Sequence, residues 1–261
     1  MEKMISEFLE SENIKYYASV SVEKCPILYP KKLPEFAKSA VFFVIPYLVR
    51  DVEKRNISLY AVPRDYHLYA RGLSERFALL AEREFPELEY RFFADNSPFC
   101  ERSCAEMCGL GKRGKSGLLI NPEYGSFFFI GSICFSYNIS ITQNTENFKC
   151  DLCENCEKCK TFCPMARNSL GECLSAITQK KKITEAEAEI IASYPVKWGC
   201  DICQEVCPYN EGSSETPIEF FKARRTPFLT AELIENMSDE EFSERAYSWR
   251  GREVIKRNLG L

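Results

Sequence analysis

The hydrophobic pattern of the N-terminal half alternates between helical and strand periods. Residues 1–14 place apolar side chains at helical spacing among charged ones, which predicts a short amphipathic helix. Residues 40–48 (AVFFVIPYL) form a nearly continuous apolar run, which predicts a buried strand that its proline ends or bends. Residues 66–85 return to helical spacing and stop before Pro86, so we expect a longer helix there.

The alternation continues toward residue 135. Residues 90–94 predict a strand, and residues 99–108 predict a helix with Gly109 as its C-cap. Two further strands are expected at residues 118–121 and 126–135. Because strand and helix alternate, we expect this half to form one α/β domain.

A polar stretch at residues 142–149 predicts a domain boundary. We therefore divide the chain into three parts: an α/β domain at residues 1–145, a cysteine-rich domain at 146–215 and a helical tail at 216–261. No internal repeat other than the cysteine runs is visible.

Composition excludes several classes of protein. No apolar stretch in the 261 residues approaches the roughly 20 residues of a membrane helix. The net charge of −4 gives no overall electrostatic case for binding nucleic acid, and we expect no DNA partner. With 45% hydrophobic residues and no secretory signal, we expect a cytoplasmic globular protein without a membrane partner.

Two cysteine runs are the strongest chemical signal, within a total of 14 cysteines. The first reads Cys153-x2-Cys156-x2-Cys159-x3-Cys163-Pro164, and the second reads Cys200-x2-Cys203-x3-Cys207-Pro208, with Cys173 between them. This spacing is that of bacterial two-cluster ferredoxins, in which the fourth cysteine of a run binds the other cluster. We therefore predict two 4Fe–4S clusters, and the expected ligand sets are Cys153, Cys156, Cys159 and Cys207 for one and Cys163, Cys173, Cys200 and Cys203 for the other.

Other uses of these cysteines fit less well. Structural zinc would use two x2 pairs rather than a triple followed by x3-Cys-Pro. Disulfides require an oxidising compartment. Cys150 precedes Cys153 by another x2 gap and remains an alternative ligand, while Cys100, Cys104 and Cys108 share one helical face as buried thiols or as a third metal site.

Three polar segments stand out upstream. Residues 64–67 (RDYH) contain the only histidine of the chain, and Asp95 ends a predicted strand, where open α/β sheets place their ligands. Residues 109–116 form a glycine-rich basic loop suited to an anion such as phosphate. The loop lacks P-loop spacing, which disfavours ATP. Simpler interpretations remain open: Asp95 as a helix cap, His67 as a structural residue and the loop as a mere connection.

The order of these motifs resembles the epoxyqueuosine reductase family from about residue 40 to the C-terminus. The resemblance is carried by RDYH at residues 64–67, Asp95-x2-Pro98 with Arg102, Gly109-x-Gly111-x2-Gly114-Lys115, GSFFFIG at residues 125–131, and Gly199-Cys200-Asp201-x-Cys203-Gln204 with the first cysteine run. It implies a cobalamin-binding α/β domain of the reductive dehalogenase and nitroreductase type, followed by a ferredoxin-like domain. The implied reaction reduces the epoxide of epoxyqueuosine in tRNA to the alkene of queuosine, with electrons passing from two clusters to cobalt.

The resemblance also assigns roles. Asp95 takes the position of the proton donor, and burial beside a large cofactor would raise the pKa of such a carboxyl. The expected cofactor-binding residues are Tyr66, His67, Asp95, Arg102, Gly111, Lys115, Ser116 and Gln204. The implied partners are tRNA and a low-potential electron donor of the ferredoxin or flavodoxin type.

Two features of the C-terminal part bear on the substrate. Longer members of the family continue into a helical-repeat domain that grips tRNA, and this chain ends where that domain would begin. Basic residues between 224 and 257, and Lys180 to Lys182, suggest contacts with phosphates, although a solvated face is the commoner use of such charges. A two-cluster electron-transfer protein serving a partner enzyme, and a tRNA-binding module with structural clusters, therefore remain alternatives.

Overall fold

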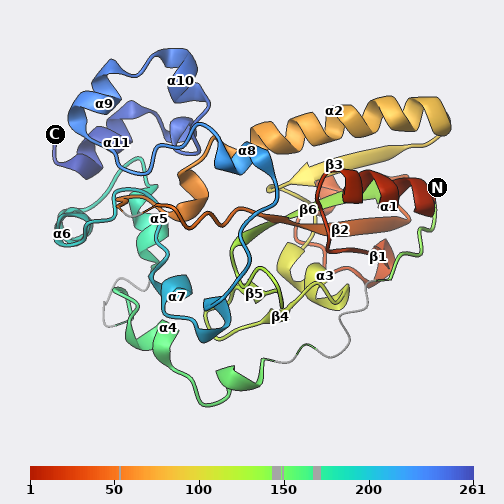
Figure 1. Cartoon of the computed structure of the whole chain (residues 1–261), viewed down its shortest axis with the longest axis horizontal. Coiled ribbons are helices and arrows are strands. Elements are labelled where there is room, and N and C mark those ends of the chain that lie inside the picture. Colours follow the sequence, from red (N-terminus) through yellow and green to blue (C-terminus); the bar gives the residue numbers. More distant parts are fainter. Residues whose placement is uncertain (53, 143–147, 149, 167–171) are drawn as a thin grey trace.

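A four-stranded antiparallel sheet organises the N-terminal half of the computed structural model, which describes residues 1–52, 54–142, 148, 150–166 and 172–261 (Figure 1). The spatial order is β1-β2-β6-β3, with these strands at Tyr17–Ser21, Ser39–Pro46, Phe128–Phe135 and Tyr90–Ala94. A separate two-stranded sheet pairs β4 (Lys112–Arg113) with β5 (Leu119–Ile120).

The apolar run of β2 is buried on both faces, and alternate residues enter two different cores. Phe43 and its like-facing neighbours join the core under α1 (Glu2–Ser11) and α2 (Tyr66–Glu84). Phe42 and its neighbours join the core that contains α3 (Glu101–Met107). The period of two in a strand thus explains why this segment carries no polar face.

Glycine makes one close approach possible at the centre of the sheet. Gly131 of β6 lies opposite Phe43 of β2, and a Cβ at Gly131 would meet the Phe43 ring at 2.3 Å. The ring therefore occupies the space over Gly131, which is a common reason for glycine inside a strand.

The expected elements of the N-terminal half are present, with shifts of a few residues at their ends. The strand at Tyr90–Ala94 has the predicted bounds, and the predicted helices appear as α1, α2 and α3. The strand expected at residues 118–121 appears as β5, whereas β1 and β4 were not predicted. All pairings between strands β1 to β6 are antiparallel, so the rule that ligands bind at the carboxyl ends of parallel strands does not explain the position of Asp95.

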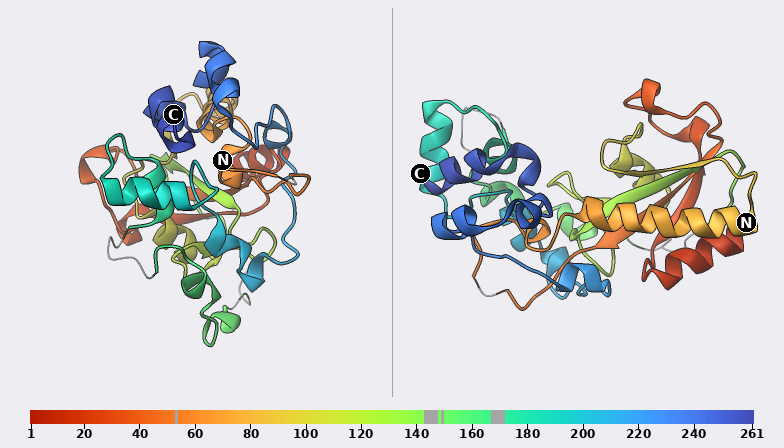
Figure 2. Two further views of the ribbon diagram at one scale, coloured as in Figure 1. Left: turned by 90° about the vertical axis from the view of Figure 1, so that its left-hand side faces the viewer. Right: turned by 90° about the horizontal axis from the view of Figure 1, so that it is seen from above.

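Short helices and loops make up the rest of the chain. The helices are α4 (Lys158–Thr161), α5 (Leu174–Thr178), α6 (Glu185–Ser193), α7 (Ile202–Glu205), α8 (Glu219–Lys222), α9 (Ala231–Asn236), α10 (Asp239–Ser243) and α11 (Arg252–Leu259). Figure 2 shows the sheet with α1 and α2 toward one end of the molecule and the C-terminal helices toward the other.

The C-terminal segment packs on the preceding parts. Phe221 of α8 is fully buried in the core under α1 and α2. Trp198 and Ile57 share a third core with Tyr247 and Ile255. Both cores contain residues from before and after the second expected domain boundary, at residues 215–216. The division of the chain into three parts therefore remains a proposal.

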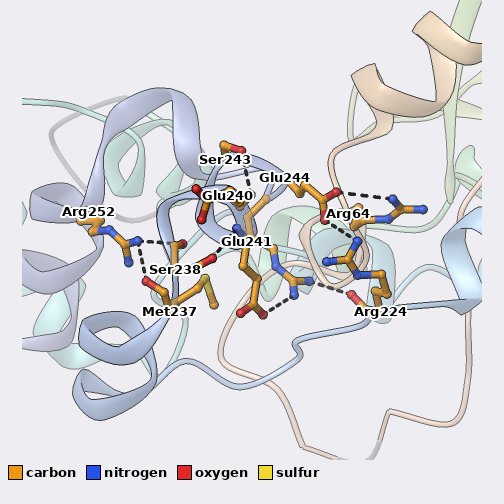
Figure 3. A network of polar contacts seen from close by, with 10 residues as sticks. Arg64, Arg224, Met237, Ser238, Glu240, Glu241, Ser243, Glu244 and Arg252 are labelled. Carbon is orange, nitrogen blue, oxygen red and sulfur yellow. Dashed lines mark hydrogen bonds and ion pairs between the residues drawn. The ribbon is translucent and has the colours of Figure 1, made fainter.

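Most basic residues of the C-terminal segment have partners within the protein (Figure 3). Arg252 donates to the carbonyls of Met237 and Ser238 at 2.6 and 2.9 Å, and Arg224 pairs with Glu244 at 2.8 Å. Arg245 is 3% exposed and pairs with Glu241. These arginines hold the helices together, which disfavours their use as a free phosphate-binding surface.

Among the described helices, none is both long enough and apolar enough to cross a membrane.

Candidate active site

A cavity of about 820 Å³ opens where α2 begins, β3 ends and α3 begins, with the C-terminal segment on its far side. Tyr66, His67, Asp95 and Arg102, four of the predicted site residues, line this cavity together. Its other lining residues are Leu28, Tyr29, Tyr60, Asp65, Asn96, Ser97, Phe99, Cys100, Glu101, Phe129, Gln179, Ala246 and Trp249.

Stacked aromatic rings form one wall of the cavity. The rings of Tyr66 and Phe129 lie 3.9 Å apart and nearly parallel, at 10°. Tyr60 meets Phe129 edge-on. Burial raises the pKa of the Tyr66 hydroxyl, and the charge of Asp95 adds to the effect. Tyr66 is therefore a neutral hydrogen-bonding group at neutral pH.

Asp95 lies in the loop that follows β3. Its φ of 60° and the φ of 51° at Asn96 are left-handed, a conformation that Asp and Asn tolerate better than most residues. The helix-cap alternative for Asp95 is not supported, because α3 has Cys100 as its N-cap residue. Ser97 instead accepts a hydrogen bond from the Phe99 amide at 3.3 Å.

His67 stands between two carboxylates. Asp65 caps α2 by accepting from the backbone amide of His67 at 3.0 Å. The imidazole Nδ1 lies 2.8 Å from Asp65 Oδ1, and Nε2 lies 4.0 Å from Asp95 Oδ2. The hydrogen bond to Asp65 raises the pKa of His67 against the opposing effect of burial. His67 is thus placed to hold a proton beside Asp95.

Glu101 is a second acid at the cavity that sequence reasoning missed. Burial, with a smaller contribution from the charge of Asp95, raises the pKa of Glu101 to about 7, although a hydrogen bond with Ser97 lowers it. Its Oε1 is buried with no hydrogen-bond partner among the described residues. In the sequence, Glu101 resembles any acid in the first turn of a helix, so no local signal identifies it.

Arg102 occupies the edge of the cavity. Its Nη1 donates to the carbonyl of Gly117 at 2.7 Å, which ties the guanidinium to the glycine-rich loop. The side chain is otherwise exposed. Arg102 is therefore positioned to offer its remaining donors to an anionic group.

The first predicted ligand set encloses a small cavity of its own. Cys153, Cys156, Cys159 and Cys207 all line it, together with Gly114, Lys115, Ser116, Ile120, Lys158 and Pro208. No group of described His, Cys, Asp or Glu side chains is arranged around a single metal ion. A cubane cluster is a larger body than one ion, so its ligands surround a cavity rather than a point.

The second predicted set also gathers in one place. Burial raises the pKa of Cys203 to about 12, and the neighbouring thiols of Cys200, Cys173 and Cys163 add to the effect. Cys163 and Cys200 also pack against the small core around Ile177. All 14 cysteines are free of disulfides.

The cysteines outside these two sets differ in their surroundings. Cys150 does not line the first cavity, although its pKa of about 11, raised by burial, also reflects the nearby Cys153 and Cys207. Its Sγ lies 3.8 Å from the carbonyl of Lys112. Cys104 and Cys108 pack in a core with other buried residues, as small apolar thiols do.

The glycine-rich loop lies at the first cysteine cavity and not at the larger cleft. Lys115 pairs with Glu157 at 2.6 Å and donates to the carbonyl of Glu154 at 3.0 Å. Ser116 accepts from the Leu118 amide at 3.3 Å. A Cβ at Gly111 would meet the Ile120 carbonyl oxygen at 2.4 Å, so this glycine allows close packing on β5.

Gln204 also lies away from the larger cleft. Its side-chain nitrogen donates to the carbonyl of Ser126 at 2.9 Å and approaches Tyr47 Oη at 3.3 Å. Asn210 completes this buried network by accepting from the Ser126 amide at 2.8 Å. The network joins the second cysteine run to the sheet domain, which is a positioning role.

Asp201 makes a second connection between the two regions. It is 2% exposed, accepts from the Leu59 amide at 2.6 Å and pairs with Arg55 Nη1 at 2.8 Å. Ser58 donates a further hydrogen bond to it. The loop of Cys200 and Cys203 is therefore fixed to the residues just before Tyr60 of the cleft.

The chain is similar to several proteins named epoxyqueuosine reductase. The epoxyqueuosine reductase of Cyclobacterium marinum is 32% identical over 230 residues, which cover 83% of this chain and 72% of that protein. The epoxyqueuosine reductase of Escherichia coli is 33% identical over 201 residues, 71% of this chain and 50% of that protein, so the chain matches only half of the longer relative. No protein-family model matches the chain.

Solved structures show the same fold. The epoxyqueuosine reductase of Streptococcus thermophilus superposes with a TM-score of 0.77 at 24% identity, covering 99% of this chain and 80% of that chain. A catabolic reductive dehalogenase superposes with a TM-score of 0.55 at 18% identity, covering 98% of this chain and 36% of that chain. The expected α/β fold of the reductive dehalogenase type is confirmed, and by its identity to the curated enzymes the chain belongs to the epoxyqueuosine reductase family.

Proposed function

We propose that this chain is a cobalamin- and iron–sulfur-dependent reductase that converts tRNA-bound epoxyqueuosine to queuosine. The observation that carries the proposal is the meeting of Asp95, His67 and Tyr66 in one large cleft, in a chain that also gathers two cysteine quartets. Relatives support the substrate: one solved epoxyqueuosine reductase holds an epoxyqueuosine-modified tRNA stem loop. A solved reductive dehalogenase of the same fold is described as B12-dependent.

The residues of the cleft fit a large, flat cofactor whose ring has apolar faces and a polar edge. The stacked Tyr66 and Phe129 offer an aromatic wall, and Leu28, Tyr29 and Trp249 add exposed apolar surface at the edge. The buried and unpartnered Oε1 of Glu101 offers one polar contact from inside the cleft. When bound there, cobalamin would supply the reducing electrons at its cobalt.

The chain itself would supply the proton. Removing the oxygen of an epoxide as water requires proton donation, and Asp95 lines the cleft without a fixed cap role. His67 has a raised pKa and stands 4.0 Å from Asp95, so it would hold a proton ready for that carboxylate. Tyr66, kept neutral by burial, would orient a polar group of the substrate.

The cysteines would hold two 4Fe–4S clusters. One quartet lines a common cavity, and in the other the thiols of Cys163 and Cys173 raise the pKa values of Cys200 and Cys203 in addition to the effect of burial. Asp201 and Gln204, both within the second cysteine run, fix that loop against the sheet domain. This arrangement would carry electrons from the clusters toward the cleft. The electron source would be a low-potential donor of the ferredoxin or flavodoxin type in the cytoplasm.

An anaerobic reconstitution tests the proposal. The protein would be loaded with iron and sulfide, mixed with cob(II)alamin, and its EPR spectrum compared with that of the free cofactor. About eight irons per chain, a protein-induced change in the cobalt signal and turnover of epoxyqueuosine-tRNA are expected. Two clusters with an unchanged cobalamin spectrum would contradict the reductase and favour an electron-transfer protein that serves a partner enzyme.

A further inference from the structure

A second large depression lies beside the first cysteine cavity. It has a volume of about 1010 Å³ and shares Lys158, Cys207 and Pro208 with that cavity. It has no lining residue in common with the cleft of Asp95. We call this depression the cluster groove. A molecule seated in it would lie directly against the position of the first cluster.

The walls of the cluster groove come from segments that are distant from one another in the sequence. The adjacent helices α4 and α7, which lie side by side in Figure 1, provide Lys158 and Ile202. The segment after β2 provides Arg50 and Lys54, and the loop before α9 provides Phe228. The groove therefore depends on the folded arrangement of both halves of the protein.

Two large aromatic side chains are exposed here. Phe162 is 59% exposed and Phe228 is 50% exposed, and both line the groove. Phe162 also directly precedes Cys163, a predicted ligand of the second cluster. Apolar rings left in water beside a groove are typical of a protein-binding surface.

The charged residues that line the groove are mostly cations. Its lining includes the cations Arg50, Lys54, Arg55 and Lys158 against the acids Glu205 and Glu211. Arg55 is held by Asp201 and Glu205, so it belongs to the internal structure. Lys54 and Lys158 are exposed and form no ion pair with any described residue. These two lysines would favour an acidic partner.

From these contacts we infer that the cluster groove is the docking site of a small acidic protein that carries a low-potential one-electron cofactor. The transfer is a single electron: the partner's cofactor is oxidised by one electron, and the oxidised first cluster is reduced by one, without making or breaking a covalent bond. The inference rests on the proposed function, because it requires the clusters. Nucleic acid fits this groove less well, since its two arginines, Arg50 and Arg55, are each held by contacts within the protein.

Stopped-flow reduction of the reconstituted protein tests the inference, with bleaching of the cluster absorbance as the readout. The wild type and the variants Lys54→Glu, Phe228→Ala and their combination would be mixed with a reduced acidic ferredoxin or flavodoxin, and separately with dithionite. The matched controls are Lys3→Glu on α1, which reverses an exposed charge, and Leu79→Ala on α2, which removes an exposed apolar side chain.

The groove variants are expected to lower the second-order rate with the protein donor by about tenfold at low salt, while the control variants leave it unchanged. The wild-type rate should fall as salt rises, and the dithionite rate should be the same throughout. Equal donor-driven rates in wild type and groove variants would overturn the inference. So would groove variants that weaken tRNA binding while the donor-driven rate stays constant.

Failure of the proposed function gives a different result. If dithionite does not bleach the wild-type protein, or if the protein holds no iron after reconstitution, the clusters are absent and the inference is lost together with them. If dithionite bleaches the clusters but the groove variants react with the protein donor at the wild-type rate, only the docking site is contradicted and the clusters are still present.

Discussion

His67 Nδ1 lies 2.8 Å from Oδ1 of Asp65, the same residue that caps the first turn of α2 through the His67 amide. One carboxylate thus fixes both the start of the helix and the orientation of the ring. With Nδ1 engaged, Nε2 is the nitrogen that faces Asp95, at 4.0 Å. The arrangement places a proton-holding ring beside the proposed acid.

The first prediction concerns the titration of this ring. Because Asp65 raises the pKa of His67, we expect its midpoint above the ordinary 6.5, and Asp65→Asn should lower it. NMR of the imidazole nitrogens measures this without ambiguity, since the chain has only one histidine. Asp51→Asn, which removes a carboxylate paired with Arg225, is the matched control.

The same shift predicts a direction for stability. A histidine whose folded pKa is raised stabilises the native state fully below its unfolded pKa, and the effect is lost as pH rises through the folded value. The wild type should therefore lose more stability than Asp65→Asn as pH rises from about 6 through the folded pKa. Identical pH profiles for the two proteins would contradict the link between Asp65 and His67.

A second prediction follows from the buried acid. The pKa of Glu101 rises from an ordinary 4.5 to about 7, so the folded protein binds this proton more tightly than the unfolded chain does. Stability should fall as pH rises between these values, and Glu101→Gln should remove that fall. At pH 8 the variant should be the more stable by up to about 3 kcal/mol, with little difference near pH 4. Urea denaturation at several pH values measures the unfolding free energy of the wild type and of the variant. If the two depended on pH in the same way, the raised pKa of Glu101 would be contradicted.

The third prediction tests the proposed acid. Asp95→Asn should lower turnover by at least about 100-fold, because amides do not donate protons as acids do. Asparagine tolerates the left-handed conformation at this position, so the loop should keep its shape. Iron content and the cob(II)alamin EPR spectrum should match the wild type. Unchanged turnover would remove Asp95 from the mechanism.

A fourth prediction compares a buried ion pair with an exposed one. Arg55→Ala leaves Asp201 without its cation in a fully buried place, which should cost about 3–5 kcal/mol of unfolding free energy. Arg225→Ala breaks the pair with Asp51, whose side chain is 66% exposed, and should cost much less unfolding free energy. If chemical denaturation showed the same loss of unfolding free energy for Arg55→Ala and Arg225→Ala, the proposal that Asp201 anchors the cysteine loop would be contradicted.

Much of the fold could be predicted because its elements have strong local patterns. The fully apolar run of β2 predicts a buried strand, and the helical period of α2 predicts a helix, without information from the rest of the chain. Strand β1 could not be identified, because its YASVS sequence mixes apolar and small polar residues and is defined by pairing with β2. The antiparallel arrangement likewise depends on partners distant in sequence, which periodicity does not report.

The candidate site was predictable where residues form short motifs. Residues 65–67 of the RDYH motif and Asp95 lie together in the cleft, since each is at the end of an element that faces it, whereas Arg64 does not line the cleft. Lys115 and Gln204 lie near the cysteine runs instead. The β4–β5 pair positions Lys115 beside Glu157, and a hydrogen bond to Ser126 holds Gln204. Glu101 became notable only through its burial, a property of the tertiary structure.

The last prediction separates the cluster ligands from their neighbour. Cys207 lines the first cavity with its three proposed partners, whereas Cys150 does not. The nearby thiols of Cys153 and Cys207 nevertheless contribute to the raised pKa of Cys150. Cys207→Ser should lower the iron content from about eight per chain to about four, and Cys173→Ser should do the same at the other quartet. Cys150→Ser should keep all the iron and the wild-type visible spectrum, which controls for the loss of a thiol as such. Colorimetric iron and sulfide analysis after anaerobic reconstitution gives the answer. Loss of one cluster in Cys150→Ser with full iron in Cys207→Ser would exchange the two residues in the ligand set, since a 4Fe–4S cluster takes four thiolates and no fifth.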